Sequence, residues 1–417
     1  MRTINRARRV LATLVVATTT VAAVAAGSPA EADHEDGGPW IVTLGDSAIS
    51  GEAGRWAGNT NDSYTRVDAG GWDAYYDNAT GTAEQIPGCH RSESAEVHIG
   101  VNGVNAVNSL NLACSGARTS TQTGGDFKPG IDFYDDGAGG QGQATMLQEF
   151  AADHDVDAVV LLIGANNYGF ADIVTQCVLN WMTSPWWWKN YCNDDSSIRS
   201  RFTTSAIAAR TAEVKAAIDN VVSALDAAGQ AQDTYTLIVQ TYWSPVPRGA
   251  DIRYSERGWT RQSVGGCGMW NRDADWANDV AVVAMNRSLT DAAATARLQH
   301  PSLVVEVLDM QRALHGHRLC EQGVGLLEEV GVADWTVLPA APDRTEWVSQ
   351  IRTTTTIFGP YQLQEDIHSS YWGQLAMRNC LRQAYGNGGE AVSGGTCTPA
   401  AGGGVNGYGE PNMTLTP

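Results

Sequence analysis

The sequence predicts an α/β protein: a three-layer α/β/α sandwich around a parallel central sheet. Short apolar runs rich in β-branched residues alternate with longer segments of helical periodicity. Strands that alternate with helices are typical of crossover units and of a parallel sheet covered on both faces. The composition, 43% hydrophobic and 18% charged, is that of a globular chain rather than a disordered one.

The expected elements follow from these runs in chain order. Five strands are expected, the second weaker than the others: 40–44, 104–114, 158–163, 236–242 and 302–309. Helical periodicity covers three segments: 201–228, 276–298 and 371–385. In such sheets ligands bind beyond the carboxyl ends of the strands.

Other parts of the chain lack this periodicity. Two stretches rich in Gly and Asp, 53–88 and 124–142, are expected to be long surface excursions from the core. We therefore expect one domain, 33–386, with long loop insertions. The Gly-rich residues 387–417 have little apolar content, and we expect an irregular C-terminal tail held by Cys397.

The charge balance excludes two kinds of partner. The chain has 27 Lys and Arg against 46 Asp and Glu, for a net charge of −19. Nucleic acid is bound through basic residues that neutralise phosphates, so this balance argues against it. It also argues against attachment to an anionic membrane surface through a basic patch.

The first 32 residues are expected to be a secretory signal peptide. Four Arg residues precede an apolar run at 10–26, and Ala30-x-Ala32 offers a cleavage site. A membrane anchor is the alternative, but the run is short and is interrupted by three Thr residues at 18–20. We expect a soluble, secreted (extracellular) mature protein, since no later stretch is apolar enough to span a membrane.

The cysteines fit an oxidising compartment. There are eight, an even number, in a chain expected to be exported. Eight cysteines allow 105 pairings, and the sequence alone does not select one. The simplest expectation is that neighbours pair, and no ligand spacing supports a zinc site instead. The expected pairs are Cys89 with Cys114, Cys177 with Cys192, Cys267 with Cys320, and Cys380 with Cys397.

Four short motifs lie where strands end or a helix begins. A Ser hydroxyl becomes nucleophilic when an imidazole removes its proton, and the resulting oxyanion needs preorganised donors. Ser47 and His368 are the candidate nucleophile and base, and the Ser47 N–H, the Gly116 N–H and the Asn166 carboxamide are the candidate donors. The four motifs are Gly45-Asp46-Ser47, Ala113-Cys114-Ser115-Gly116-Ala117, Gly164-Ala165-Asn166-Asn167 and Glu365-Asp366-Ile367-His368.

This order of motifs resembles the SGNH hydrolases, also called the GDSL family of esterases and lipases. The resemblance implies a three-layer α/β/α fold, a Ser nucleophile, a His base and no cofactor. It covers residues 40–385 and includes two further stretches, Cys-x-Arg-Ser at 89–92 and Gly-His-Arg-x-Cys at 316–320. Secreted bacterial members with disulfides carry both stretches, which supports the pairing of neighbouring cysteines.

The chain departs from the family pattern at three places. Asn167 stands where the family usually has Asp, and Ser369 follows His368 where Pro is usual. The imidazole needs an acceptor on its second nitrogen. The family often has Asp three residues before the His, whereas this chain has Glu365 there. Glu365, Asp366 or a main-chain carbonyl, which some members use, are the candidates for this role.

These features together predict an exported serine ester hydrolase, an esterase or lipase. We expect a monomer without metal or cofactor, acting on an acyl lipid or an acylated glycan. A carbohydrate acetyl esterase is the alternative within the class, and a non-catalytic glycan- or lipid-binding module on the same fold is the alternative outside it. The Trp-rich segment 181–188 follows the strand that leads to Asn166, so we expect at least one of its rings in or near the catalytic cleft. The alternative is a loop that folds back over the sheet and is held by its disulfide.

Overall fold

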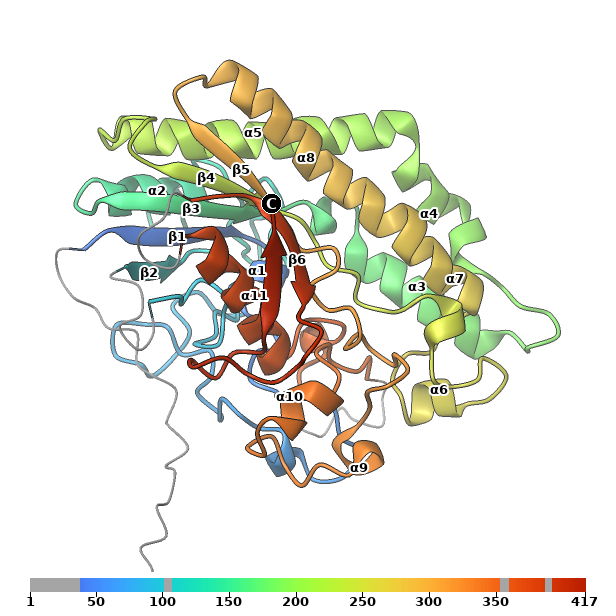
Figure 1. The fold of residues 1–417 in the computed structure, drawn as a ribbon. Coiled ribbons are helices and arrows are strands. Elements are labelled where there is room, and N and C mark those ends of the chain that lie inside the picture. Colours follow the sequence, from blue (N-terminus) through green and yellow to red (C-terminus); the bar gives the residue numbers. More distant parts are fainter. Residues whose placement is uncertain (1–37, 101–106, 353–359, 387–391) are drawn as a thin grey trace, which may run out of the picture.

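A seven-stranded sheet forms the centre of the fold (Figure 1). The computed structural model describes residues 38–100, 107–352, 360–386 and 392–417, so the expected signal peptide lies outside the described residues. The spatial order is β2-β1-β3-β4-β5-β6-β7, and all neighbours are parallel except β6 and β7. The strands are β1 Trp40–Gly45, β2 Asn108–Asn111, β3 Val156–Leu162, β4 Thr236–Gln240, β5 Val304–Asp309, β6 Gly395–Pro399 and β7 Met413–Thr416.

Helices lie on both sides of this sheet. In Figure 1, α5 and α8 pack along each other on one side with α2 beside α5, and α11 lies on the other side against β6 and β7. This arrangement confirms the predicted three-layer fold class. The α-helices are α1 Ser47–Ser50, α2 Gln143–Ala151, α3 Phe170–Thr183, α4 Ser196–Arg199, α5 Thr204–Ala227, α6 Thr260–Ser263, α7 Asn271–Trp276, α8 Val282–Gln299, α9 Leu327–Val330, α10 Ala340–Arg344 and α11 Tyr371–Ala384.

The central strands are apolar along their length because both faces are covered. All six residues of β1 are buried, and so are six of the seven in β3. Burying each large aliphatic side chain contributes about 1.5–3 kcal/mol. The register pairs Gly45 at the end of β1 with Leu162 at the end of β3. The residues that follow these two strands therefore meet at one edge of the sheet.

The five expected strands and three expected helices are present with shifted ends. The greatest difference is at 276–298, where one helix was expected. In the structure α7 ends at Trp276, a π-helical turn follows over Ala277–Ala281, and α8 begins at Val282. Two helices that flank the site, α2 and α3, were not predicted from the sequence.

The C-terminal residues correct another expectation. Instead of an irregular tail, 392–417 supply β6 and β7, which extend the sheet beyond β5. Both strands are short, and β6 contains Gly and Pro, so the two strands would be only marginally stable as an isolated hairpin. Pairing with the free edge of β5 and the Cys380–Cys397 disulfide to α11 supply the missing stability.

All four disulfides join neighbouring cysteines, as predicted: 89 with 114, 177 with 192, 267 with 320, and 380 with 397. The first lies beside the carboxyl edge of the sheet, because the Cys114 N–H donates a hydrogen bond to the Gly45 carbonyl at 3.1 Å.

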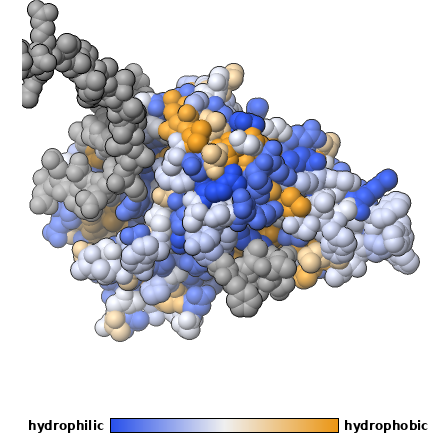
Figure 2. Space-filling view, turned by 90° about the horizontal axis from the view of Figure 1, so that it is seen from below, coloured by the Kyte–Doolittle hydropathy of each residue, from blue (hydrophilic) through white to orange (hydrophobic). Residues whose placement is uncertain are grey.

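One face of the molecule is mainly hydrophilic. Figure 2 shows blue and white side chains over most of one face, with apolar residues in patches between them. Among the described residues, no helix is both long and apolar enough to cross a bilayer.

The two C-terminal strands should contribute to global stability. Replacing both Cys380 and Cys397 by Ser opens a loop with a sequence separation of 17 residues and should lower the free energy of unfolding by about 3 kcal/mol. Urea unfolding followed by circular dichroism measures this loss. Thr414→Ala, at an exposed position of β7, is the control. An unchanged midpoint in the double Cys variant would argue that 392–417 is an accessory segment.

Candidate active site

Ser47 lies at the junction of β1 and α1. Gly45 has no room for a side chain, since a Cβ there would lie 2.0 Å from the Leu162 carbonyl oxygen. The Asp46 carboxylate caps α1 by accepting a hydrogen bond from the Ala48 amide at 3.1 Å. Ser47 is the first residue of α1 and is 8% exposed, so its hydroxyl lies at the carboxyl edge of the sheet.

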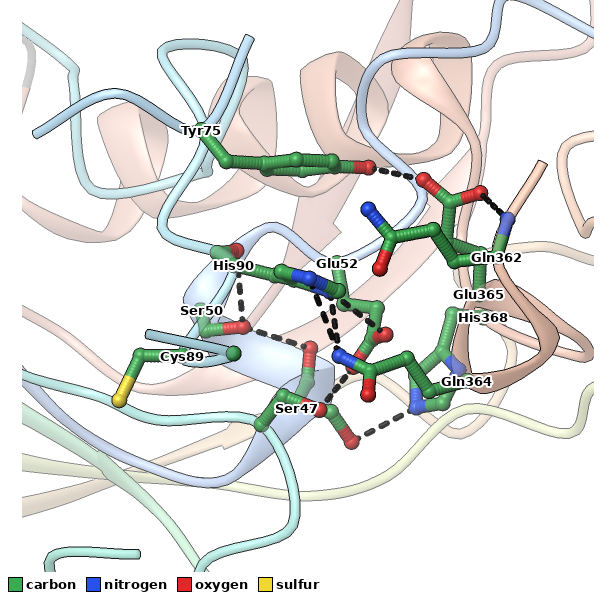
Figure 3. A network of polar contacts seen from close by, with 12 residues as sticks. Ser47, Ser50, Glu52, Tyr75, Cys89, His90, Gln362, Gln364, Glu365 and His368 are labelled. Carbon is green, nitrogen blue, oxygen red and sulfur yellow. Dashed lines mark hydrogen bonds and ion pairs between the residues drawn. The ribbon is translucent and has the colours of Figure 1, made fainter. Parts of the chain in front are cut away.

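His368 contacts this hydroxyl directly. Its Nε2 lies 2.6 Å from Ser47 Oγ (Figure 3). Ile367 N donates to Ser349 O at 3.0 Å, and Ser349 N donates to His368 O at 2.8 Å. Ile367 has a φ of +63°, which is unfavourable for a β-branched residue. These hydrogen bonds hold a strained turn next to the imidazole, a combination often found at functional sites.

A main-chain carbonyl orients the imidazole. His368 Nδ1 lies 3.0 Å from the carbonyl oxygen of Asp366, which can only accept a hydrogen bond. A proton on Nδ1 leaves Nε2 with a lone pair facing the Ser47 hydroxyl, as a general base requires. Of the candidates named from the sequence, the main-chain carbonyl is the group in position.

Glu365, the preferred candidate from the sequence, turns away from the ring. Its carboxylate accepts hydrogen bonds from Tyr75 OH at 2.6 Å and from the Gln362 amide at 2.8 Å (Figure 3). It also accepts one from Trp56 Nε1 at 2.9 Å. Spacing along the chain does not determine side-chain direction, and here the turn before His368 points this carboxylate into a buried set of donors. Its contacts hold the turn rather than the imidazole.

The Asp366 carboxylate is also engaged elsewhere. It accepts a hydrogen bond from the Arg352 amide at 2.8 Å. Burial raises the pKa of Asp366 to about 7, although this hydrogen bond and the Arg352 charge oppose the shift. Asp366 therefore faces His368 through its backbone alone.

Two of the three predicted oxyanion donors lie next to the cavity that holds His368. Asn166 lines the same cavity as Ser47 and His368, and its side-chain N–H donates to the Ala117 carbonyl at 3.0 Å. Gly116 lies in the adjoining loop, outside this lining, with a φ of +80°. Among the described residues, no hydrogen bond uses the backbone N–H of Ser47 or Gly116. Both amides are available, and the oxyanion roles of Ser47, Gly116 and Asn166 all stay predictions.

Asn167 has a physical reason to replace the usual Asp. Its carboxamide donates to Glu213 Oε2 and to Thr119 Oγ1, both at 2.7 Å, and accepts from the Thr119 amide at 3.2 Å. An ionised Asp could not donate to Glu213 and would be repelled by it. These bonds tie the loop after Gly116 to the turn that carries Asn166.

A buried carboxylate lies beside the nucleophile. Tyr242 OH donates to Asp46, and the Ala165 amide donates to Tyr242 OH at 2.9 Å. Burial raises the pKa of Asp46 to about 7, although hydrogen bonds from Tyr242 and the Ala48 amide oppose the shift. The sequence motifs did not identify Tyr242, which follows the last residue of β4 by two positions.

A second polar cluster, part of which is drawn in Figure 3, lies next to α1, the short helix that carries Ser47. Glu52 Oε1 and His90 Nδ1 are 3.0 Å apart with almost no exposure, and Ser115 Oγ donates to the other Glu52 oxygen. The side-chain nitrogen of Gln364 lies 2.7 Å from His90 Nδ1. Burial lowers the pKa of His90, but the Glu52 hydrogen bond and nearby carboxylates outweigh it and raise that pKa. The cluster connects α1 to the loop of His368.

An apolar cavity of about 50 Å³ lies beside the Ser47 hydroxyl. Its volume corresponds to roughly four water-sized spaces. We call it the acyl cavity, because a short hydrocarbon chain is the part of an ester that would fit it. Its aromatic and aliphatic lining comes from Phe170, Trp243, Pro245, Val282, Met285 and Ile367.

The Trp-rich segment 181–188 does not reach this cavity, contrary to expectation. Trp181 is buried near the C-terminal end of α3 and packs edge-on against Trp259, with ring centroids 5.7 Å apart. Trp187 and Trp188 are 72% and 80% exposed. The first residue of α3 lines the acyl cavity, and the helix carries this segment about 20 Å away from it.

Solved structures of ester hydrolases resemble the chain. An extracellular lipase from Streptomyces rimosus aligns with a TM-score of 0.41 at 19% identity, over 81% of this chain and 94% of that one. Phospholipase A1 from Streptomyces albidoflavus gives 0.39 at 18% identity, over 81% and 95%. An aryl esterase from M. smegmatis gives 0.29 at 10% identity, over 72% and 95%. No protein-family model and no curated protein sequence matches the chain.

The carbonyl orientation of His368 makes Glu365 dispensable for chemistry. Glu365→Gln should keep kcat for a p-nitrophenyl ester within about tenfold of wild type, whereas a carboxylate that orients the imidazole is worth about 10⁴-fold. Gln replaces one acceptor oxygen by a donor, so the free energy of unfolding should fall by about 1–3 kcal/mol. Asp366→Asn, which keeps the carbonyl, is the matched control. A 10⁴-fold loss of kcat in folded Glu365→Gln would show that the Glu365 carboxylate orients the imidazole.

Ionisation of Asp46 should cost stability. Its pKa is raised to about 7 from 3.8, so the folded state holds this proton more tightly than the unfolded state. Stability is therefore lost as the pH rises from about 4 through about 7. Between pH 5 and 8, wild type should lose about 2 kcal/mol relative to Asp46→Asn. Urea unfolding at both pH values measures the difference.

The control for this pH effect is Asp153→Asn, which changes an exposed carboxylate. It should follow wild type at both pH values. Parallel pH profiles for wild type and Asp46→Asn would show that burial does not shift this carboxyl.

Proposed function

We propose that the chain is a serine ester hydrolase that acts through an acyl-enzyme on Ser47. The observation that supports this proposal most directly is the 2.6 Å contact between Ser47 Oγ and His368 Nε2. His368 Nδ1 lies at the same time within hydrogen-bond distance of the Asp366 carbonyl oxygen. This geometry meets the requirement for an activated nucleophile, in which a base contacts the hydroxyl and a third group orients the base. It also argues against a module that has lost turnover, since binding alone does not require this contact.

In the first half-reaction, His368 accepts the Ser47 proton as Oγ attacks the carbonyl carbon of the ester. The negative charge that forms on the carbonyl oxygen is stabilised by the Ser47 and Gly116 amides and by the Asn166 carboxamide. One such donor is worth about 3–4 kcal/mol of barrier. The tetrahedral intermediate then collapses, the alcohol leaves, and His368 gives it the proton.

In the second half-reaction, a water molecule attacks the acyl-enzyme. His368 accepts a proton from the water, and the same donors stabilise the second oxyanion. Collapse releases the carboxylic acid and returns the proton to Ser47. The acyl group occupies the apolar acyl cavity throughout, and the volume of about 50 Å³ favours short chains.

A carbohydrate acetyl esterase is the second candidate. The observation that favours it is a groove of about 230 Å³ at the Trp-rich segment, where Trp186, Trp187 and Trp259 surround Glu256 and Arg257. Aromatic faces beside charged groups suit stacking on sugar rings. Release of acetate from acetylated xylan, compared with hydrolysis of tributyrin, separates the two candidates.

We further propose that the protein is exported after removal of residues 1–32. Four disulfides among the described residues support this proposal, because such bonds persist in oxidising compartments.

The nucleophile is tested with p-nitrophenyl esters from acetate to palmitate. Wild type should hydrolyse the short esters fastest, and Ser47→Ala should lower kcat by at least about 10³-fold at every chain length. Ser50→Ala removes a hydroxyl from the same short helix, with no contact to His368, and should stay within about tenfold of wild type. Equal rates for wild type and Ser47→Ala would eliminate this mechanism.

A further inference from the structure

A second cavity lies on the other side of Asn166. It has a volume of about 370 Å³ and is separate from the acyl cavity, although Asn166 lines both. Its walls are polar, and three arginines contribute to them: Arg118, Arg201 and Arg210. We call it the arginine cavity.

The concentration of cations in this cavity contrasts with the rest of the chain. The net charge is −19, and three of only 27 Lys and Arg residues meet here. Asp172 is the one acidic residue in the lining. The cavity therefore attracts anions, whereas the net negative charge of the protein repels them.

The three guanidinium groups differ in how fully they are used. Arg201 bonds to the Tyr168 and Gly169 carbonyls and to Asp172, so it is a fixed part of the wall. Arg210 uses one terminal nitrogen for the Asn167 carbonyl. That nitrogen also lies 2.9 Å from Glu213. The remaining N–H groups of Arg210 form no hydrogen bond to the described residues.

Arg118 is the available cation. It is exposed, and its guanidinium has no ion pair or hydrogen bond with the described residues. Arg201 and Arg210, which line the same cavity, both have such partners. An unpaired guanidinium beside a second one with free donors is suited to a phosphate, whose oxygens accept paired N–H groups.

The position of Arg118 connects this cavity to catalysis. It is two residues from Gly116, in the loop that Thr119 and Asn167 hold in place. An ester whose carbonyl lies between Ser47 and the Asn166 carboxamide has its acyl chain in the acyl cavity. Because Asn166 also lines the arginine cavity, the alcohol portion then has a path past Asn166 toward the arginines.

We propose that the arginine cavity binds a phosphate group carried by the alcohol portion of the ester substrate. This inference rests on the proposed function and specifies its substrate class: a carboxylic ester of a phosphorylated alcohol. Water cleaves only the carboxylic ester bond, which yields the acid and the alcohol with its phosphate intact. The phosphate is a handle for binding and does not react.

The test compares two soluble substrates that differ in one group. Wild type should hydrolyse 1,2-dibutyrylglycerol 3-phosphate with a kcat/KM about tenfold above that for 1,2-dibutyrylglycerol. Arg118→Ala should remove this preference while leaving kcat/KM for the neutral ester within twofold of wild type, because Arg118 has no structural partner to lose. Arg118→Lys should keep part of the preference, since it keeps the positive charge but loses the paired N–H donors of the guanidinium.

Arg287→Ala is the matched control. Arg287 is an exposed arginine of α8, 71% exposed, and its removal changes the net charge by the same amount away from the cavity. It should change neither kcat/KM value. The proposal is overturned if wild type shows no preference, or if Arg118→Ala and Arg287→Ala reduce the preference equally.

Calorimetry on the Ser47→Ala background measures the site without turnover. Glycerol 3-phosphate should bind, and adding Arg118→Ala should abolish its binding; absence of heat up to about 10 mM would overturn the proposal. If inorganic phosphate binds through Arg118 but turnover shows no preference, the site takes free phosphate and the substrate assignment is wrong. Hydrolysis of the neutral ester by wild type reports on the proposed function separately.

Discussion

The hydrogen bond between Ser47 and His368 joins residues 321 positions apart, and the buried carboxylate of Glu365 stabilises the turn that precedes His368. A buried carboxylate without partners costs several kcal/mol. Trp56 and Tyr75 supply two of its donors, and both come from the excursion after α1. That excursion was expected to lie on the surface, but Trp56 is fully buried. The long insertion thus supports the turn that carries His368.

The parts of the site that could be predicted from the sequence are those tied to strand ends. Apolar runs identify β1 and β3, and register at the carboxyl edge brings Ser47 and Asn166 together. His368 could be predicted only through the order of motifs, because nothing in its own segment indicates which strand it approaches. Tyr242 follows the same rule as Ser47 and Asn166, since a polar group beyond a buried strand reaches the same edge, yet no motif marks it.

The features that escaped prediction depend on contacts distant in sequence. Glu365 and Asp366 have the same acidic chemistry near the imidazole, and only the folded turn decides that a carbonyl faces the ring while both carboxylates face other donors. The C-terminal strands are too short to be stable as an isolated hairpin, and they pair with the edge of β5, which offers unpaired backbone groups. In both cases the deciding partner comes from another part of the chain.

Asn166 divides the site by polarity. One side is an apolar cavity, where a hydrocarbon chain gains free energy by leaving water, and the other side is polar and cationic. A substrate with one apolar and one anionic end therefore has a single favourable orientation across the Ser47 hydroxyl. Reversing it would place an anion among Phe170 and Met285, where its desolvation is not compensated. For the substrate proposed above, the two cavities would align the carbonyl with the Ser47 hydroxyl before any chemistry begins, which is how binding energy remote from the reacting bond contributes to catalysis.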